Sequence, residues 1–143
     1  MIILDTNVTS ELMRGRPDTA VMAWIADQPP NELFSTVVTV AEITYGLERL
    51  PQGRRRTSLE QAYQSLFLSM AAHVLPFDVE AALLYGPLVA SKEQAGIAMD
   101  PMDAQLACIA ASHGAMIATR NERDFADCGA RLVNPWRHGS SRE

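Results

Sequence analysis

Met1-Ile-Ile-Leu-Asp-Thr-Asn7, the first seven residues, carry the clearest structural signal in this sequence. Three large aliphatic residues lead directly into a carboxylate, a hydroxyl and an amide. An unbroken apolar run that ends in polar residues predicts a strand buried on both faces, as in a parallel sheet. Ligands of parallel sheets bind at the carboxyl ends of the strands, so Asp5 is a candidate active-site residue. Asp5 could equally be a simple cap or turn residue, and Thr6 or Asn7 could cap the next helix.

The rest of the sequence alternates predicted helices with predicted strands. Further strands are predicted at 33–38, 73–77, 115–119 and 131–133. Helices are predicted between the first strand and Gly15, from Asp18 to Pro29, and at 39–50, 59–72, 78–95 and 104–112. Pro87 should kink or split the helix at 78–95, and residues 39–72 should form a helical hairpin outside the sheet. This order predicts a three-layer α/β/α fold with a mainly parallel central sheet of four to five strands.

The chain is predicted to form one domain, residues 1–137, followed by a disordered tail at 138–143. Its 143 residues, 48% hydrophobic and 20% charged, suit a folded domain with a substantial core. No apolar run approaches the roughly 20 residues that span a bilayer, and the apolar start lacks the basic lead of a signal peptide. We therefore expect a cytoplasmic protein without a membrane segment.

Cysteine and histidine show no pattern of a metal site or a disulfide framework. Cys108 and Cys128 are far apart and belong to no cluster of cysteines and histidines. Cys108 lies in an apolar helical run, which favours a small core residue. The three histidines are also scattered, so we expect structural or exposed positions for them.

The formal net charge of −5 argues against binding to nucleic acid through bulk electrostatics. Eleven of the twelve basic residues are nevertheless arginine, whose planar guanidinium suits phosphate groups. Solvated surface charge is the alternative explanation for these residues. The candidates for contact with an RNA backbone are Arg14, Arg16, Arg54, Arg55, Arg56 and Arg120.

Four carboxylates adjoin the ends of the predicted strands. They are Asp5 after the first strand, Glu42 one helical turn past the second, Asp103 at the start of the helix before 115–119, and Asp124 just after that strand. Two carboxylates about 4 Å apart repel by roughly 4 kcal/mol at an effective dielectric near 20, so such a cluster favours a bound cation. Ligands that are all oxygen select a hard ion, which predicts Mg²⁺ or Mn²⁺.

These acids also have purely structural interpretations. Thr39-x-x-Glu42 fits a capping box, which would make Glu42 a helix-start residue only. Asp100-Pro101 fits a helix cap followed by proline at the first helical position. We therefore favour Asp103 as the site residue and keep Asp100 as the alternative. Asp124 could be an ordinary surface acid. Each structural interpretation is credible by itself, but all four acids would need one at the same time, which is less credible.

Five pieces of the sequence occur together in a specific order that covers residues 1 to about 136. They are Ile3-Leu4-Asp5-Thr6-Asn7, Thr39-Val40-Ala41-Glu42 followed by Gly46, Asp103-Ala104-Gln105-Leu106-Ala107, Ala118-Thr119-Arg120-Asn121 with Asp124-Phe125, and Asn134-Pro135-Trp136. With these pieces the chain resembles PIN-domain proteins of the VapC/FitB type, toxin ribonucleases of bacterial type II toxin–antitoxin pairs. The acidic approach Met99-Asp100-Pro101 departs from the usual family pattern.

The resemblance implies a parallel sheet flanked by helices and a metal-dependent endoribonuclease activity. It matches Asp5, Glu42 and Asp103 to the family's three main acidic ligands, Asp124 to a more variable fourth, Thr119 to a hydroxyl near the site, and Asn7 to a polar neighbour of the first acid. It also implies an RNA substrate, a cognate antitoxin, and both a homodimer and a toxin–antitoxin hetero-oligomer.

On this basis we expect Mg²⁺ or Mn²⁺ at the acids to activate water against an RNA phosphodiester, since no histidine or lysine is placed as a general base. A catalytically inactive PIN-fold scaffold is one alternative. A phospho-acceptor signalling domain is another, but it would need paired acids after the first strand and a lysine near the last. Lys92, the only lysine, lies inside a predicted helix.

Overall fold

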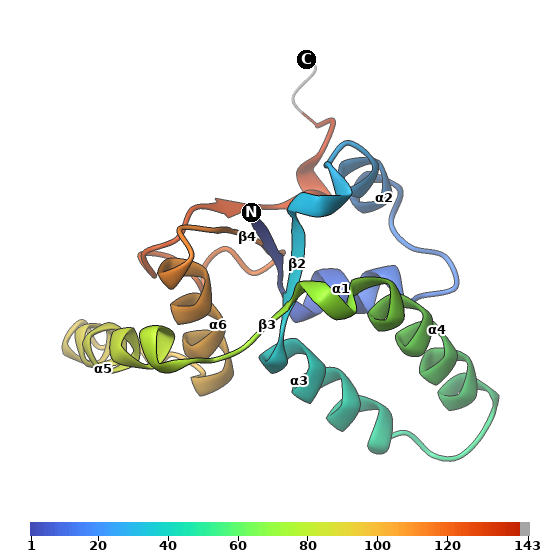
Figure 1. Cartoon of the computed structure of the whole chain (residues 1–143), viewed down its shortest axis with the longest axis horizontal. Helices are drawn as coiled ribbons and strands as arrows, with labels where there is room; N and C mark the ends of the chain where they lie inside the picture. Colours follow the sequence, from blue (N-terminus) through green and yellow to red (C-terminus); the bar gives the residue numbers. More distant parts are fainter. Residues whose placement is uncertain (141–143) are drawn as a thin grey trace.

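The computed structural model describes residues 1–140, in which helices and strands alternate around one sheet (Figure 1). The strands are β1 (Ile2–Leu4), β2 (Leu33–Thr36), β3 (Val74–Leu75), β4 (Met116–Ala118) and β5 (Leu132–Val133). The α-helices are α1 (Thr6–Leu12), α2 (Thr19–Ala26), α3 (Val37–Glu48), α4 (Arg54–Met70), α5 (Val79–Gln94) and α6 (Pro101–Ser112). Short 3-10 helices lie at η1 (Pro30–Glu32), η2 (Ala71–His73) and η3 (Pro135–Arg137).

The five strands form one sheet in the order β3-β2-β1-β4-β5, and every neighbouring pair is parallel. The three-layer fold with a parallel central sheet is therefore confirmed. β1 is the central strand, with Ile3 opposite Phe34 of β2 on one side and Ile117 of β4 on the other. The chain first builds the sheet outward from β1 through β2 to β3, and later adds β4 and β5 on the opposite side. The strand order thus reverses at β1, where open α/β sheets leave a crevice for ligands.

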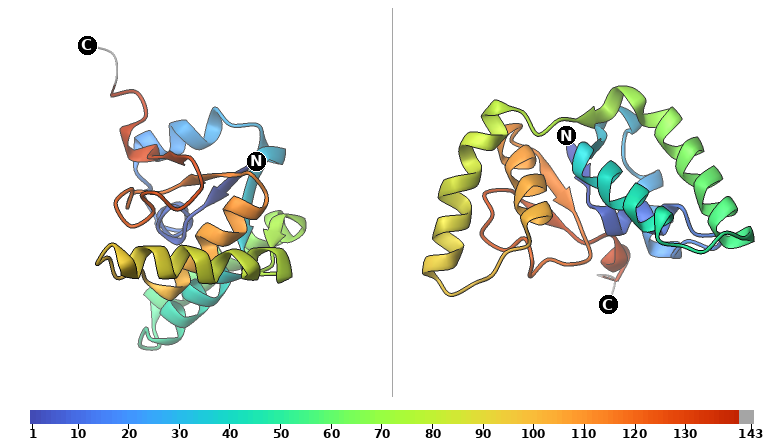
Figure 2. Two further views of the ribbon diagram at one scale, coloured as in Figure 1. Left: turned by 90° about the vertical axis from the view of Figure 1, so that its left-hand side faces the viewer. Right: turned by 90° about the horizontal axis from the view of Figure 1, so that it is seen from below.

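Side chains alternate between the two faces of the sheet, and each face carries its own hydrophobic cluster. Ile3 and Ile117 are fully buried against α6 and its neighbour α5. Leu4 and Ala118, the next residues along, pack with Val8 of α1 and with α2. Figure 2 shows α5 and α6 together on one side of the sheet. These two clusters confirm the prediction that the first strand is buried on both faces. A strand packed on both faces needs an apolar side chain at every position, which explains the unbroken apolar run.

Helices α3 and α4 form the predicted hairpin beside the sheet (Figure 1). Ile43 and Leu47 of α3 are buried against apolar residues of α4 that include Leu59 and Leu66. The turn between the helices is tied by Arg56, whose guanidinium bonds the carboxylates of Glu48 and Glu60 and the Leu50 carbonyl. Packing and ion pairing together therefore fix the hairpin as a stiff unit.

Two helices start earlier than the sequence predicted. α3 begins at Val37, inside the segment predicted as strand, because the Thr36 hydroxyl caps it by accepting a 3.2 Å hydrogen bond from the Thr39 amide. The β-forming run Thr36-Val37-Val38 concealed this boundary. α4 begins at Arg54 rather than near Leu59, so the three consecutive arginines are helical.

Of the predicted kink or split at Pro87, the split is wrong, since α5 runs without interruption from Val79 to Gln94. Proline removes one N–H and frees the carbonyl four residues earlier, which belongs to Leu83. Leu83 and Pro87 both lie on the exposed side of α5, where water can bond the freed carbonyl. The helix therefore tolerates the proline.

Aspartate caps four of the helices. Asp18, Asp78 and Asp100 accept hydrogen bonds from the first-turn amides of α2, α5 and α6, as predicted. Asp5 itself caps α1, so the prediction that Thr6 or Asn7 takes that position is wrong. The β-region backbone of Asp5 directly after β1 suits a cap, whereas Thr6 already belongs to the helix.

At the C-terminal end, His138 Nε2 lies 2.8 Å from Oδ2 of Asp27 at the end of α2. Residues 138–140 of the segment predicted as a disordered tail are thus described, whereas 141–143 lie outside the described residues. Within residues 1–140, no helix is both long enough and apolar enough to traverse a bilayer.

Candidate active site

The carboxyl end of β1 lies at the point where the strand order reverses, and Asp5 occupies it. Its amide donates a 2.9 Å hydrogen bond to the Ala118 carbonyl of β4, which continues the parallel pairing. Its side chain is 4% exposed. Oδ1 accepts a 2.7 Å hydrogen bond from the Thr6 amide, and Oδ2 accepts a 2.8 Å hydrogen bond from the Thr119 hydroxyl. Asp5 is therefore a helix cap and also a buried acid at the carboxyl end of the central strand, so the two interpretations of the sequence are compatible.

Thr119 is fully buried and connects the ends of β1 and β4. Besides donating to Asp5, its hydroxyl oxygen accepts hydrogen bonds from the Asn121 amide at 3.0 Å and from Nδ2 of Asn7 at 3.4 Å. Oδ1 of Asn7 accepts in turn from the Arg120 amide at 3.3 Å. The two residues that the sequence assigned to the surroundings of the first acid thus form one network with it.

Glu42 reaches this network from α3. Its Oε1 accepts a 2.9 Å hydrogen bond from the Thr6 hydroxyl, whose oxygen also lies 3.2 Å from Oγ1 of buried Thr39. The capping-box interpretation of Glu42 is wrong, because α3 starts at Val37 and Thr36 caps it. A residue six positions into α3 is too far from the helix start to bond the cap amide. The Glu42 carboxylate is instead directed by Thr6 toward the end of β1.

Asp103 lies in the first turn of α6, where Asp100 supplies the cap. Oδ1 of Asp100 accepts from the amides of Met102 and Asp103 at 2.9 and 3.3 Å. The half-buried carboxylate of Asp103 is not needed to cap the helix. The charges of Asp5, Asp100, Glu42 and Asp124 lie close enough to it to disfavour its ionisation. Asp124 is exposed and follows β4. Acids from four separate segments therefore lie within electrostatic range of Asp103.

The electrostatics of the site are those of crowded carboxylates. Burial and repulsion from the neighbouring acids raise the pKa of Asp103 to about 7. Burial also raises the pKa of Asp5, against the hydrogen bonds from Thr119 and Thr6 that lower it and with a smaller repulsion from Glu42. Each negative charge is thus costly while no cation lies between the acids.

These residues fit a hydrated hard cation better than a closed metal cage. In the part of the chain that the structure describes, no three acidic, histidine or cysteine side chains lie close enough to form a preassembled metal site. Mg²⁺ usually keeps several waters and takes only one or two carboxylates directly. The oxygen-only donors and the raised pKa of Asp103 suit such an ion.

A groove of about 550 Å³ runs from the acids between α1, α3 and α4. Glu42 and Thr6 are among its lining residues, together with Arg14, Arg55 and Arg120. The Arg120 guanidinium lies 5.2 Å from the ring centroid of Trp136, which also lines the groove. The aromatic residue of the closing Asn-Pro-Trp piece is thus a groove residue that the sequence did not identify.

The predicted arginines divide into two groups. Arg14, Arg55 and Arg120 line the groove, whereas Arg16 and Arg54 are exposed residues outside its lining. Arg56 is a third case, because its half-buried guanidinium is already bonded within the α3–α4 hairpin. Being adjacent in sequence does not place Arg54, Arg55 and Arg56 alike, since successive helical residues point in directions about 100° apart.

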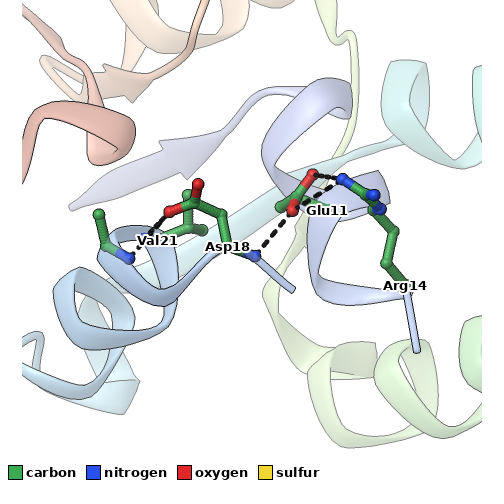
Figure 3. A network of polar contacts seen from close by, with 5 residues as sticks. Glu11, Arg14, Asp18 and Val21 are labelled. Atoms are coloured by element: carbon green, nitrogen blue, oxygen red, sulfur yellow. Dashed lines mark hydrogen bonds and ion pairs between the residues drawn. The ribbon is translucent and has the colours of Figure 1, made fainter. Parts of the chain in front are cut away.

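Glu11 is a buried acid whose position the sequence gave no reason to single out. Figure 3 shows its carboxylate between Arg14 and the start of α2. Oε1 accepts a 2.8 Å hydrogen bond from the Asp18 amide, and the Arg14 guanidinium donates to both carboxylate oxygens at 3.2 and 3.1 Å. Glu11 therefore closes the loop between α1 and α2 and directs Arg14 along the groove.

A second cavity of about 570 Å³ opens on the other side of the acids, next to α5 and α6. Its lining combines two cations with four acids: Lys92 and Arg123, and Asp100, Asp103, Asp124 and Asp127. The sequence placed Lys92 in a helix away from the site. The end of α5 in fact brings this lysine to the same cavity as Asp103 and Asp124.

Comparison with known proteins agrees with this arrangement. The PIN domain family matches residues 2–130. A relative named VapC ribonuclease Y4jK, from Sinorhizobium fredii, is 41% identical over 95% of this chain and 98% of its own length. The Neisseria gonorrhoeae protein named Toxin FitB is 32% identical over 95% of this chain and 99% of its own.

The crystal structure of FitAcB from Neisseria gonorrhoeae superimposes with a TM-score of 0.86 at 32% identity, covering 95% of this chain and 99% of that one. Sequence and overall structure thus agree over nearly the whole chain. The chain belongs to the PIN domain family, with relatives named VapC ribonuclease and Toxin FitB.

Proposed function

We propose that this protein is a metal-dependent endoribonuclease that acts in the cytoplasm as the toxin of a type II toxin–antitoxin pair. The observation that carries the proposal is the convergence of Asp5, Glu42 and Asp103 at the crevice, where burial and then repulsion from the neighbouring acids raise the pKa of Asp103 to about 7. If these acids served only in structural ion pairs, each would lie beside a basic residue. In this site the partners of Asp5 and Glu42 are threonine hydroxyls and a backbone amide.

The names of the relatives support the choice of reaction and biological role. Proteins named VapC ribonuclease and Toxin FitB each align with 95% of this chain. The PIN domain match at residues 2–130 includes all four acids. A nuclease reaction on RNA and a toxin role are therefore the proposals that best combine the relatives with this chemistry.

Asp5, Glu42, Asp103 and Asp124 would hold Mg²⁺ or Mn²⁺ in this proposal. Such an ion, when bound, lowers the pKa of the attacking water and neutralises charge on the phosphate oxygens. Thr119 and the Thr6 amide keep Asp5 in one rotamer, and the Thr6 hydroxyl does so for Glu42. Asp103 must lose its proton to hold such an ion, and its pKa of about 7 in the metal-free protein makes this loss depend on pH near neutrality.

The groove would receive the RNA strand beside the acids. Arg14, Arg55 and Arg120 supply positive charge along it, although the whole chain carries −5. Arg120 and Trp136 together offer a stacking platform for a base. A strand lying in the groove would place a phosphate near Glu42. Single-stranded or looped RNA fits this route better than a duplex, because stacking requires an unpaired base.

A cognate antitoxin and a second copy of this chain are the proposed protein partners, in a homodimer and a toxin–antitoxin hetero-oligomer. Large apolar side chains are exposed on two separate helical surfaces. Tyr45 and Leu68, 64% and 80% exposed, lie on the α3–α4 hairpin, and Val79 and Leu83, 75% and 72% exposed, lie on α5. Exposed apolar patches of this kind commonly mark protein interfaces.

The function is tested by incubating the purified protein with total RNA in the presence of Mg²⁺ or Mn²⁺, then with a chelator, and mapping the cleaved ends. We expect the protein to cleave RNA and the chelator to stop the cleavage. Asp5→Asn and Asp103→Asn should abolish cleavage and leave the circular dichroism spectrum unchanged. Asp27→Asn is the matched control, because its exposed carboxylate pairs with His138 instead of the site.

An inactive scaffold would show neither metal binding at the acids nor RNA cleavage, and that result would overturn the proposal. Incorporation of a phosphoryl group at Asp5 from a phospho-donor, without RNA cleavage, would favour the signalling alternative instead. Full cleavage by Asp5→Asn would separate the activity from these acids and would also contradict the mechanism.

A further inference from the structure

Lys92 is the only lysine in the sequence and is 8% exposed. Removing an ammonium group from water costs several kcal/mol, so lysine is seldom buried without a paired acid. Within residues 1–140, no carboxylate oxygen comes within ion-pair distance of its Nζ. The side chain instead donates a hydrogen bond to the carbonyl oxygen of Ala126. A buried lysine with one neutral partner requires a reason beyond helix packing.

The backbone at Lys92 is fixed by the end of α5. The Ile97 amide donates 2.9 Å to the Lys92 carbonyl, and the Gly96 amide donates 3.0 Å to the Glu93 carbonyl. Gly96 has a φ of +73°. These two bonds and a left-handed glycine form a Schellman motif, which terminates the helix rigidly. Lys92 therefore extends from a stationary backbone toward the segment after β4.

Besides the Lys92 contact, the segment after β4 is held near Asp124 by Glu122, which accepts a 3.2 Å hydrogen bond from Nδ2 of Asn134 and pairs with Arg137 at 3.1 Å, and by the turns of its own backbone. Its backbone turns through the hydrogen bonds Asp124 N–H to the Asn121 carbonyl, 3.0 Å, and Phe125 N–H to the Glu122 carbonyl, 3.3 Å. Phe125 is buried in the core on one side of the turn. On the other side Asp127 has a φ of +54°, an uncommon conformation outside glycine that needs support from neighbouring structure. Ala126, the partner of Lys92, lies between these two residues.

Lys92, Asp103 and Asp124 line the same cavity. Lys92 thus contacts the backbone two residues after Asp124. The next residue, Asp127, is the one with the left-handed conformation. Holding the Ala126 carbonyl restrains the backbone two residues after Asp124. It also places a positive charge beneath a surface where four acids gather, which opposes their mutual repulsion.

We propose that Lys92 is a positioning residue that holds the 123–127 segment through the Ala126 carbonyl, so that Asp124 faces Asp103 across the cavity. Its consequence for catalysis rests on the proposed metal-dependent nuclease function. The anchoring itself is independent of that function and is measured separately. The ammonium touches neither substrate nor metal in this role.

The first test is amide hydrogen exchange of the full chain, comparing Lys92→Met and Lys92→Arg with the unaltered protein. We expect Lys92→Met to raise exchange of the amides of residues 124–128 by tenfold or more, with little change in β1 or α1. Lys92→Arg keeps a cationic donor and should restore most of the protection. Glu93→Gln is the matched control, because it alters an exposed charge on the same helical turn without contacting the segment.

The second test measures Mn²⁺ binding by electron paramagnetic resonance in a double-mutant cycle with Asp124→Asn. We expect Lys92→Met to weaken Mn²⁺ binding about tenfold when Asp124 is present, a change typical of altered support for a ligand. The same substitution should change binding less than twofold in the Asp124→Asn background. A residue that merely stabilised α5 would have equal effects in both backgrounds, and that outcome overturns the proposal.

Unchanged exchange at 124–128 in Lys92→Met also overturns it. If Lys92→Met does not fold, Lys92→Gln provides a neutral donor of similar length, and protection lower than in Lys92→Arg is then expected. Absence of RNA cleavage and of Mn²⁺ binding in the unaltered protein would refute the proposed function, whereas the exchange experiment would still decide whether Lys92 anchors the segment.

Discussion

The Thr119 hydroxyl donates a 2.8 Å hydrogen bond to Oδ2 of Asp5 across 114 positions of sequence. Register explains the contact. Leu4 of β1 pairs with Ala118 of β4, so the residue that follows each strand lies beside the other at the same edge of the sheet. Parallel strands with short crossovers thereby bring a buried carboxylate and its donor together. The acid and the hydroxyl that orients it are therefore products of the same strand pairing.

Thr119→Val should reduce RNA cleavage by roughly 10–100-fold, the usual effect of removing a group that orients a metal ligand. Valine preserves the volume but removes the donor to Asp5 and the acceptor for the Asn121 amide. The rate at subsaturating Mg²⁺ should fall more than the rate at saturation. Thr119→Ser retains the hydroxyl and should keep most of the activity. Equal losses in the two variants would show that the methyl packing, and not the hydrogen bond, is what the site requires.

Stability of the metal-free protein should fall as pH rises toward neutrality because of Asp103. Its pKa is raised from 3.8 to about 7 by burial and neighbouring acids. A raised folded-state pKa means that the folded protein holds the extra proton, so this contribution is complete below about pH 4 and is lost as pH rises through about 7. The melting temperature measured in chelator should therefore decline between those values.

Asp103→Asn should flatten this decline and melt several degrees higher than the unaltered chain at pH 8 in chelator. The difference should vanish near pH 4, where the Asp103 carboxyl is protonated. Added Mg²⁺ should raise the melting temperature of the unaltered chain more than that of Asp103→Asn, since only the former offers the full set of oxygen ligands. Identical profiles for the two proteins would contradict a crowded carboxylate at this position.

Asp100 and Asp103 should differ sharply when each is changed. Asp100→Asn keeps the hydrogen bonds to the first-turn amides of α6. The free energy of unfolding should therefore change little, and the cleavage rate should remain within about twofold of the original. Asp100→Ala should lose about 1 kcal/mol of stability with cleavage largely preserved. Denaturant melts and cleavage rates measure these effects. Loss of cleavage in Asp100→Asn comparable to that in Asp103→Asn would reverse the roles of the two acids.

Neighbouring arginines at the start of α4 offer a paired test of the groove. Arg55 lines the groove and Arg54 does not. Arg55→Ala should weaken binding of single-stranded RNA and reduce the slope of log affinity against log salt by about 0.7 for one lost phosphate contact. Arg54→Ala should leave the slope nearly unchanged. Fluorescence anisotropy over a salt series measures both, and equal slopes for the two variants would argue that RNA follows another surface.

Much of the architecture was predictable because local patterns and long-range packing agree. The apolar run before Asp5 predicted a strand buried on both faces, and Ile3 and Leu4 are 0% and 1% exposed. Asp18, Asp78 and Asp100 were identified as caps because an acid before a helical run can bond the free first-turn amides. The start of α3 was missed, because β-branched residues favour a strand locally while the Thr36 cap decides the boundary.

The candidate site was predictable only in part. Four acids at strand ends could be chosen from the sequence, since every parallel strand ends at the same edge of a sheet. The positions of Lys92, Glu11 and Trp136 could not, because each depends on which side of a helix or turn meets another element. The sequence likewise grouped Arg54, Arg55 and Arg56, which helical geometry directs to open solvent, the groove and the hairpin.

The sequence by itself determined the order of strands and helices and the burial of the first strand, and it supplied the candidate acids, because these follow from periodicity, capping chemistry and charge. Only the tertiary structure decided that the Thr119 hydroxyl bonds Asp5, that the Thr6 hydroxyl bonds Glu42 and that Lys92 bonds the Ala126 carbonyl. The reason is physical. Side-chain chemistry is a property of single residues, whereas distance and burial arise only when strands from opposite ends of the chain pair and helices pack over them.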